Sequence, residues 1–286
     1  MEVFRVKAFT NKEKIKDKNI LGSPAIVCFC KNRLPTDGQM SKLAQSNTKS
    51  NTVFLYKKRA VSNHFDIRHF NSKGDQLYLC SNGIIATLPL LKKRKIEQAK
   101  YFFDAYALEK KNIRNFFNIK IKDGLIFFDL PKMAYQSFSD KDKIENLLEI
   151  LNLQKEDIYD IVTIDILNDC FLELKNAELL RKVQPDFLKL KFWCYNTGIR
   201  NFGITAKSDL KDFDYQVRIF SPHKGKNENS ICNSSNCGLG NYWSKKLEKK
   251  ELKVLFPYQM DFNGDIGGVQ HIVVDEYHIW LGGDVE

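Results

Sequence analysis

The sequence predicts an α+β protein of two similar halves, on three observations. An arginine-x-phenylalanine pair, a turn closing on lysine-glycine and a cysteine ahead of an apolar helix occur twice in this order, from Arg68 to Cys80 and from Arg218 to Cys232. The arginine precedes the cysteine by 12 positions in the first copy and by 14 in the second. Segments of strand periodicity outnumber helical ones. The helix after Cys80 is apolar around most of its circumference, as expected for a helix enclosed by a sheet.

The first half contains predicted strands and two helices, and a hairpin follows where the second domain is expected to begin. A short helix is expected over residues 37–45 and a longer one over 81–93. Residues 116–130 predict a hairpin, because Asp123-Gly124 is a favoured pair for a tight β-turn. Apolar or alternating runs predict strands at residues 3–9, 25–29, 52–56 and 65–70.

The second half repeats this alternation. Residues 139–151 predict a helix, because an N-cap serine is followed by apolar residues at helical spacing, among them Ile144 and Leu148. A helix is also expected over 233–247, directly after Cys232. Strands are predicted at residues 159–164, 171–174, 191–196, 202–206, 215–221, 253–257, 271–274 and 277–281.

Length and repeat together predict two domains. A chain of 286 residues suits one large domain or two of ordinary size, and the repeat favours two. We place the N-terminal domain at residues 1–117 plus about 275–286, and the C-terminal domain at residues 118–274. No low-complexity linker separates them, so a firm interface is expected.

Composition narrows the function classes. No apolar run is long enough to cross a bilayer, and the N-terminus lacks the pattern of a secretory signal, so a cytoplasmic location away from membranes is expected. The formal net charge is +10 at pH 7. The basic runs at 92–95 and 245–250 end predicted helices, where cations complement the helix dipole, and we expect no nucleic-acid partner.

The seven cysteines are expected to be reduced thiols, because their number is odd and their spacing forms no disulfide framework. No cysteine or histidine cluster has zinc spacing, and neither a metal nor another cofactor is expected. Four of the cysteines lie in apolar segments and are expected in the core, namely Cys28, Cys30, Cys170 and Cys194.

Cys80 and Cys232 are the candidate catalytic residues. A thiol at a helix N-terminus has its thiolate form stabilised by the helix dipole and by free backbone N–H groups. If the two halves face each other, one thiolate removes a proton from a carbon atom while the other thiol delivers a proton to the opposite side.

Several short segments follow one another in the order seen in a known superfamily; they lie at residues 22–27, 40–54, 79–80, 184–188, 214–222, 228–243 and 281–283. In this order the chain resembles the diaminopimelate epimerase-like superfamily, and in particular its phenazine-biosynthesis (PhzF-like) branch. The resemblance implies two pseudo-symmetric domains. Each is a mostly antiparallel sheet, rolled or closed as a barrel around a central helix, and the active site lies in the cleft between them.

The usual acid–base residues of the PhzF-like branch are replaced here. Ser46 stands at the position of its glutamate, Cys80-Ser81-Asn82 replaces Cys-Gly-His, and Asn229 replaces an aspartate. Of that set, Ser234 is retained.

The same positions resemble the racemases of the superfamily. The run from Asn71 to Cys80 and on to Gly83 is similar to an epimerase Phe-Asn-x-x-Gly through Cys-Gly-Asn-Gly segment, and Glu228 precedes Cys232 by four positions, as in those enzymes. The resemblance implies that Asn71 and Glu228 bind an amino-acid substrate. Residues around the two helix starts are further substrate-binding candidates, namely Ser46, Ser81, Asn82, Gly83, Asn233 and Ser234.

The leading hypothesis is a cofactor-independent, PLP-independent racemase or epimerase, in which Cys80 and Cys232 invert a carbon atom α to a carboxylate. An alternative is a PhzF-like isomerase of a cyclic or unsaturated acid, with Glu228 as its base. A third is a catalytically silent protein that binds a small carboxylate. In each case the partner is an amino acid or related carboxylate, and a homodimer is a family expectation.

Overall fold

The computed structural model describes the chain except for residues 12–14, 16–19, 48–49, 59–63, 78–80, 94–99, 108–109 and 258–265. It is an α+β protein of many strands and few helices, which confirms the predicted fold class. The chain forms two compact units. Unit 1 comprises Met1–Thr10, Ser23–Asp129 and Gly282–Glu286, and unit 2 comprises Asn11–Gly22 and Leu130–Leu281. The sequence predicts the boundary between the domains at residues 117–118, which lie within strand β7 (Lys110–Lys122). In the structure the chain passes from unit 1 to unit 2 at residues 129–130.

Unit 1 is a curled sheet with one helix on each side. Its pairing order is β1, β2, β3, β4, β6, β7 and β8, with parallel pairs at β2–β3 and β4–β6 and antiparallel pairs elsewhere. The end of β17 returns to pair with β1. The strands are β1 Glu2–Thr10, β2 Ser23–Cys30, β3 Asn51–Lys57, β4 His64–Phe70, β5 Gln76–Leu77, β6 Lys100–Ala107, β7 Lys110–Lys122, β8 Leu125–Pro131 and β17 His278–Val285. The helices are α1 Asp37–Gln45 and α2 Ser81–Lys93.

Unit 2 has the same kind of sheet, with pairing order β9, β10, β11, β12, β13, β15 and β16. Among the described pairings none joins β9 back to β16, so this sheet is rolled and is not a closed barrel. The strands are β9 Gln136–Ser137, β10 Ile158–Ile164, β11 Asp169–Leu174, β12 Asn201–Lys207, β13 Tyr215–Ser221, β14 Lys226–Asn229, β15 Glu251–Pro257 and β16 Ile266–Val274. The helices are α3 Lys141–Leu151, α4 Ala177–Lys182, α5 Phe187–Thr197 and α6 Asn236–Leu247, with short 3-10 turns at Lys155–Asp157, Asp165–Leu167 and Pro222–Lys224.

The two units share one topology, which is the structural form of the sequence repeat. In unit 1, β4 pairs antiparallel with β3 and β5 and parallel with β6. In unit 2, β13 pairs in the same way with β12, β14 and β15. The register agrees as well, because Phe70 lies opposite Gln76 and Phe220 lies opposite Glu228. Arg68 and Arg218 therefore occupy corresponding positions.

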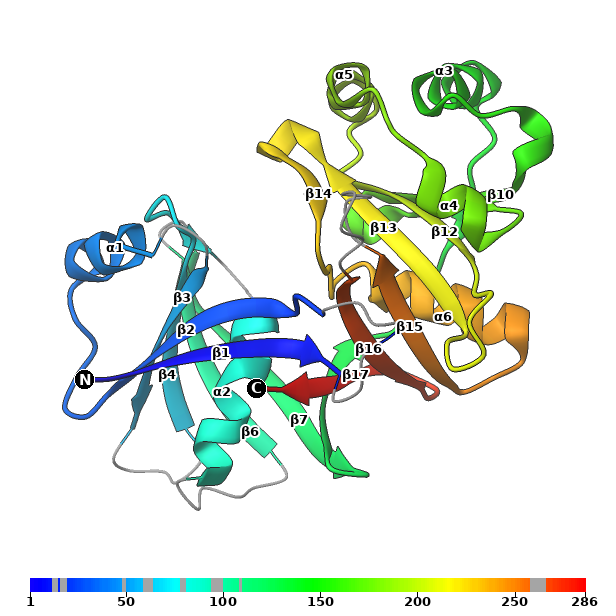
Figure 1. Cartoon of the computed structure of the whole chain (residues 1–286). Helices are drawn as coiled ribbons and strands as arrows, with labels where there is room; N and C mark the ends of the chain where they lie inside the picture. The colour runs from blue at the N-terminus through cyan, green and yellow to red at the C-terminus, as the bar shows by residue number, and fades with distance from the viewer. Residues whose placement is uncertain are drawn as a thin grey trace. The chain divides into compact units, whose positions relative to one another are not determined.

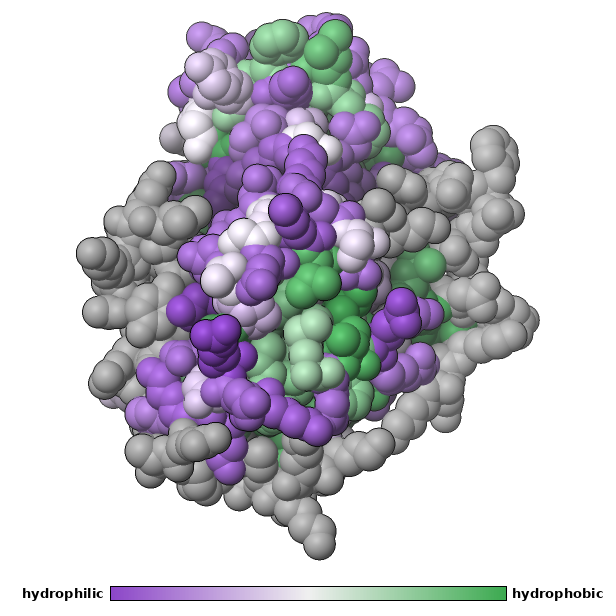
Figure 2. Space-filling view, turned by 90° about the vertical axis from the view of Figure 1, so that its left-hand side faces the viewer, coloured by the Kyte–Doolittle hydropathy of each residue, from purple (hydrophilic) through white to green (hydrophobic). Residues whose placement is uncertain are grey.

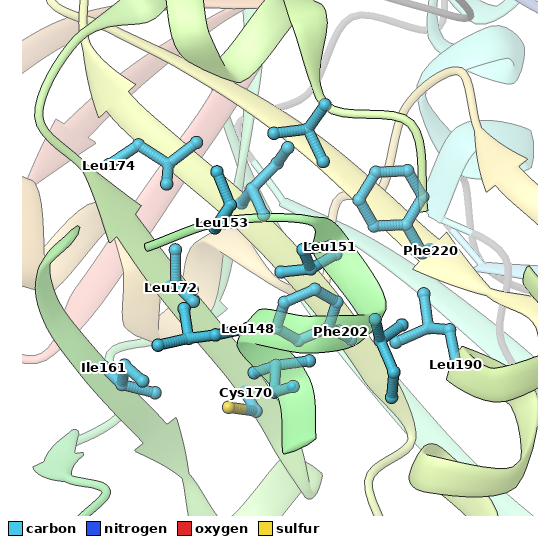
Figure 3. Close-up of a cluster of buried hydrophobic side chains, with 14 of the residues drawn as sticks. Leu148, Leu151, Leu153, Ile161, Cys170, Leu172, Leu174, Leu190, Phe202 and Phe220 are labelled. Atoms are coloured by element: carbon cyan, nitrogen blue, oxygen red, sulfur yellow. The ribbon is translucent and has the colours of Figure 1, made fainter. Parts of the chain in front are cut away.

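Unit 2 has three layers (Figure 1): α3, α4 and α5 cover one face of the sheet, and α6 lies against the other. Side chains that alternate along each strand divide between these faces. The face toward α3 and α5 carries an apolar cluster that includes Cys170, Leu172, Phe202 and Phe220 (Figure 3). On the opposite face, the Trp243 indole of α6 donates a hydrogen bond to Thr205 Oγ1 (2.9 Å).

The central helices are enclosed by their sheets. In α6 every residue from Asn236 to Trp243 is buried. In α2 residues 83–88 and Leu91 are buried, as its all-round apolar sequence predicts. Cys28 and Cys30 are buried in the apolar cluster between the sheet of unit 1 and helix α1. Cys170 and Cys194 are buried in the cluster between the sheet of unit 2 and helices α3, α4 and α5. We call these two clusters the outer core of each unit, and the predicted core positions of the four cysteines are confirmed.

One predicted strand is wrong. Residues 191–196 belong to helix α5, which Asp186 caps by accepting hydrogen bonds from the backbone N–H groups of Leu188 and Lys189. Apolar side chains surround this helix: Leu190, Trp193 and Cys194 are buried, whereas Leu188, Phe192 and Tyr195 are exposed. Because the apolar residues do not form a single stripe, the helical period is hidden and the aromatic run resembles a strand.

On the face drawn in Figure 2, hydrophilic residues surround smaller hydrophobic areas. No helix within the described ranges has both the length and the apolar character that a bilayer span requires.

Candidate functional site

Cys232 lies between β14 and α6 and differs from the other described cysteines in its exposure. It is half-buried, whereas Cys28, Cys30, Cys170, Cys194 and Cys237 are buried. Burial raises the pKa of Cys28 to about 11 and that of Cys194 and of Cys237 to about 12. A thiol reacts as its thiolate, so Cys232 is the described thiol best placed for chemistry.

A directed series of hydrogen bonds ends on the sulfur of Cys232. Asn229 Nδ2 donates to Ser221 Oγ (2.9 Å), and Ser221 Oγ donates to Asn201 Oδ1 (2.7 Å). Asn201 Nδ2 then donates to Cys232 Sγ (3.8 Å). Each member is fixed by the next, so the last amide presents its N–H to the sulfur.

An ion pair lies on another side of the same sulfur. Arg200 binds the carboxylate of Asp169 through Nε (2.9 Å) and Nη2 (2.7 Å), and Asp169 is fully buried. Arg200 Nη2 also donates to Ser234 Oγ (3.1 Å), and Ser235 Oγ donates to Asp169 Oδ2 (3.1 Å). The two serine hydroxyls lie 3.7 Å and 3.2 Å from Cys232 Sγ.

Cations outnumber anions around the thiol. The exposed Lys224 and Lys226 both interact electrostatically with Cys232, as does Arg200. Among the described residues, the carboxylate of Asp169 is the acidic group that interacts with Lys224 and Arg200. Such a surplus of positive charge favours an anionic ligand.

Several members of this site come together because strands end at one edge of the sheet. Asp169 and Asn201 begin the neighbouring parallel strands β11 and β12 and lie opposite each other. Ser221 ends the antiparallel strand β13. Sequence reasoning missed these residues together with Arg200, Asn229 and Ser235 as members of the site. A usable signal was present, since each of the three strand-end residues is a polar side chain directly at the end of an apolar strand.

Glu228 points away from this site. Directly opposed residues of paired strands share a face, and Glu228 lies opposite Phe220, whose ring belongs to the outer core. There both carboxylate oxygens accept hydrogen bonds from Arg218, at 2.8 Å and 2.9 Å. The neighbouring residue Asn229 is the one on the Cys232 face.

The other candidates of the Cys232 segment also have defined partners. The side-chain oxygen of Asn233 is buried and accepts a hydrogen bond from Gln270, which in turn accepts one from Asn236. Helix α6 begins at Asn236 and not directly after the cysteine. The N–H groups of Asn236 and Cys237 bond to the carbonyls of Asn233 and Ser234, so a turn separates the thiol from the helix.

In unit 1, Cys80 lies outside the described residues, and Ser81 is described only as the first residue of α2. Asn82 Nδ2 donates to Ser23 Oγ (2.6 Å). Gly83 lies so close to β3 and β4 that an added Cβ would be 2.6 Å from Val53 Cγ2.

Two further candidates of unit 1 serve local structure. The side-chain oxygen of Asn71 accepts hydrogen bonds from the backbone N–H groups of Lys73 and Asp75, both 2.9 Å, and so closes its own turn. Ser46 is the exposed C-cap of α1 and donates to the Leu43 carbonyl (2.7 Å).

Comparison with known proteins shows the same fold and sequence pattern. The family model described as phenazine biosynthesis-like protein (PhzC-PhzF) matches residues 6–266. A Halalkalibacterium halodurans protein named an uncharacterized isomerase is 26% identical, over 87% of this chain and 84% of its own. A putative PhzC/PhzF protein from Clostridium difficile superposes with a TM-score of 0.77 at 20% identity, over 99% of this chain and 95% of that one. A predicted epimerase from Pseudomonas aeruginosa superposes with a TM-score of 0.67 at 14% identity, over 99% and 95%.

Proposed function

The chain belongs to the phenazine biosynthesis-like (PhzC-PhzF) family, and on that premise we propose that it is an isomerase that moves a proton at a carbon atom α to a carboxylate. The name of the Halalkalibacterium halodurans relative supports an isomerase. Within this class we propose a racemase or epimerase that uses Cys80 and Cys232 as its acid–base pair and needs no cofactor.

The observation that carries the proposal is the environment of Cys232. Its half-buried sulfur accepts a hydrogen bond from Asn201 and is surrounded by the cations Arg200, Lys224 and Lys226. This arrangement suits a thiol that exchanges a proton with a carbon atom of an anionic substrate.

The second thiol of the pair is assigned through the shared topology. Cys80 follows Gln76 by four positions and Cys232 follows Glu228 by four, and these two reference residues occupy matching register positions. In the proposed reaction one thiolate takes the α-proton while the opposite thiol supplies a proton to the other side of the carbon, and the roles reverse for the other enantiomer.

The cations also indicate the substrate class. Arg200 and Lys224 lie beside the thiol and suit the carboxylate of an amino acid or related acid. The alternative in which Glu228 is the base has less support, because both of its oxygens are bound to Arg218.

The test is α-proton exchange in deuterated water with a panel of L- and D-amino acids and simple unsaturated acids. We expect exchange with inversion, and a loss of about a hundredfold or more in both Cys80→Ser and Cys232→Ser. Cys237→Ala is the matched control, because this buried thiol lies five positions after Cys232. Exchange that survives both serine substitutions would reject the two-thiol scheme, and retention of a ligand without exchange would identify a binding protein.

A further inference from the structure

Building on the proposed role of Cys232, we propose that Ser235 carries the proton of the Cys232 thiol to Asp169, which makes Ser235 and Asp169 positioning residues for proton transfer. The sulfur lies 3.2 Å from Ser235 Oγ, and Ser235 Oγ lies 3.1 Å from Asp169 Oδ2. Ser235 is 1% exposed and Asp169 is not exposed at all, so bulk water does not compete for these contacts.

The direction of transfer follows from counting protons. A serine hydroxyl has one proton, and that of Ser235 is donated to Asp169. The short contact between Ser235 Oγ and the sulfur is then satisfied by the S–H of the thiol as donor. Asn201 donates to the same sulfur. This bond uses a lone pair of the sulfur and leaves its S–H proton available to Ser235.

The transfer balances in atoms and charge. The S–H bond breaks as a new O–H forms on Ser235, and the former Ser235 proton moves to Asp169 Oδ2. The neutral thiol and the carboxylate become a thiolate and a carboxylic acid, so the net charge of the site is unchanged. A buried site avoids the desolvation penalty of an added charge in this way.

The surrounding charges act on both ends of the path. Arg200 precedes β12, Lys224 lies in the turn before β14, Lys226 is in β14, and Cys237 is in α6. All three cations interact electrostatically with Cys232. Burial raises the pKa of Asp169 and its hydrogen bonds with Arg200 oppose that rise, so the carboxylate gains basicity while it stays oriented.

The test is the rate of iodoacetamide alkylation at Cys232 between pH 4 and pH 10, followed by peptide mapping without substrate. An isolated thiol loses about tenfold in rate for each pH unit below its pKa. We expect the wild-type rate to level off instead between the two apparent pKa values of the coupled pair, because there the site holds one proton and the thiolate–carboxylic acid form is a constant fraction of it. Asp169→Asn should remove this plateau. Ser235→Ala should lower it, because the hydroxyl that bonds both the sulfur and the carboxyl is lost. Ser230→Ala, two residues before the cysteine, should retain it.

Each outcome has a distinct meaning. A wild-type profile with no plateau, or a plateau of wild-type height in Ser235→Ala, overturns the proton path. Simple loss of the Asp169 charge would move the whole rate profile along the pH axis without creating or removing a plateau. Ser235→Ala keeps the Asp169–Arg200 pair, so the test stands even if Asp169→Asn does not fold. Because no substrate is present, a plateau together with absent α-proton exchange would reject only the proposed function.

Discussion

Arg218 and Glu228 form a buried, two-pronged ion pair on the face of the sheet opposite the Cys232 site. Arg218 Nη1 also donates to the carbonyls of Leu180 (3.1 Å) and Val183 (2.7 Å), and both side chains of the pair are 2% exposed. The pair therefore ties helix α4 and the segment after it to the sheet, and its role is structural.

Glu228→Gln should destabilise the protein, because it leaves the Arg218 charge buried without its partner. The expected loss in free energy of unfolding is about 3–5 kcal/mol, measured by urea denaturation. Glu149→Gln removes an exposed pair with Lys189 and should leave the midpoint unchanged. If Glu228→Gln were as stable as the wild type but inactive, Glu228 would have to act on the substrate.

His69 should make the protein less stable in acid. It is fully buried, neither ring nitrogen has a hydrogen-bond partner among the described residues, and burial lowers its pKa to about 3. The unfolded chain binds the proton first, near pH 6.5, so stability is complete above that pH and falls as the pH decreases toward 3. At pH 5 the loss is about 2 kcal/mol.

The measurement for His69 is the free energy of unfolding against pH in the wild type and in His69→Ile. Isoleucine is the residue at the matching position of the second repeat, Ile219. The variant should have a flatter profile between pH 6.5 and pH 4 than the wild type. Equal slopes in wild type and His69→Ile would contradict a neutral buried ring.

Two glycines of α6 should respond oppositely to alanine. A Cβ on Gly238 would lie 2.2 Å from Ile164 Cδ1, whereas one on Gly240 would lie 3.4 Å or more from its neighbours. Gly238→Ala should cost about 1–3 kcal/mol through overpacking. Gly240→Ala should be neutral or stabilise by up to about 1 kcal/mol, because alanine favours the helix. Thermal melts of the two variants check this, and similar shifts would mean that α6 is not held closely against β10.

Alkylation of the native protein should modify Cys232 ahead of the other described cysteines. Burial both shields those thiols and raises the pKa of Cys28, Cys194 and Cys237. The measurement is limited labelling with iodoacetamide at pH 8, followed by peptide mapping, with a sample in denaturant as the control. Equal labelling of Cys194 and Cys232 in the native sample would contradict the burial pattern.

Local signals in the sequence were sufficient for most elements. Helix α1 has the predicted bounds because Thr36 and Gln39 form a capping box. The hairpin turns at Asp123 and Gly124, whose φ angles of 53° and 78° are those of a tight hairpin turn. The shared topology of the two units was visible as the Arg–Phe–Lys-Gly–Cys repeat.

The site was less accessible from the sequence because its members meet through strand pairing. Asp169 and Asn201 are adjacent only because β11 and β12 pair in parallel at that register. Counting four positions back from Cys232 selects Glu228, but the two-residue period of β14 sends this side chain to the far face. Its neighbour Asn229 is the residue that joins the hydrogen-bond series ending on the thiol.

Asp169, Asn201 and Ser221 stand at strand ends and join the hydrogen bonds around the thiol, whereas the interiors of their strands are apolar. Substitutions at Asn201 and Ser221 would therefore change the surroundings of Cys232 without altering the packed core. A substitution at Asp169 carries a further cost, because it leaves the Arg200 charge without its partner.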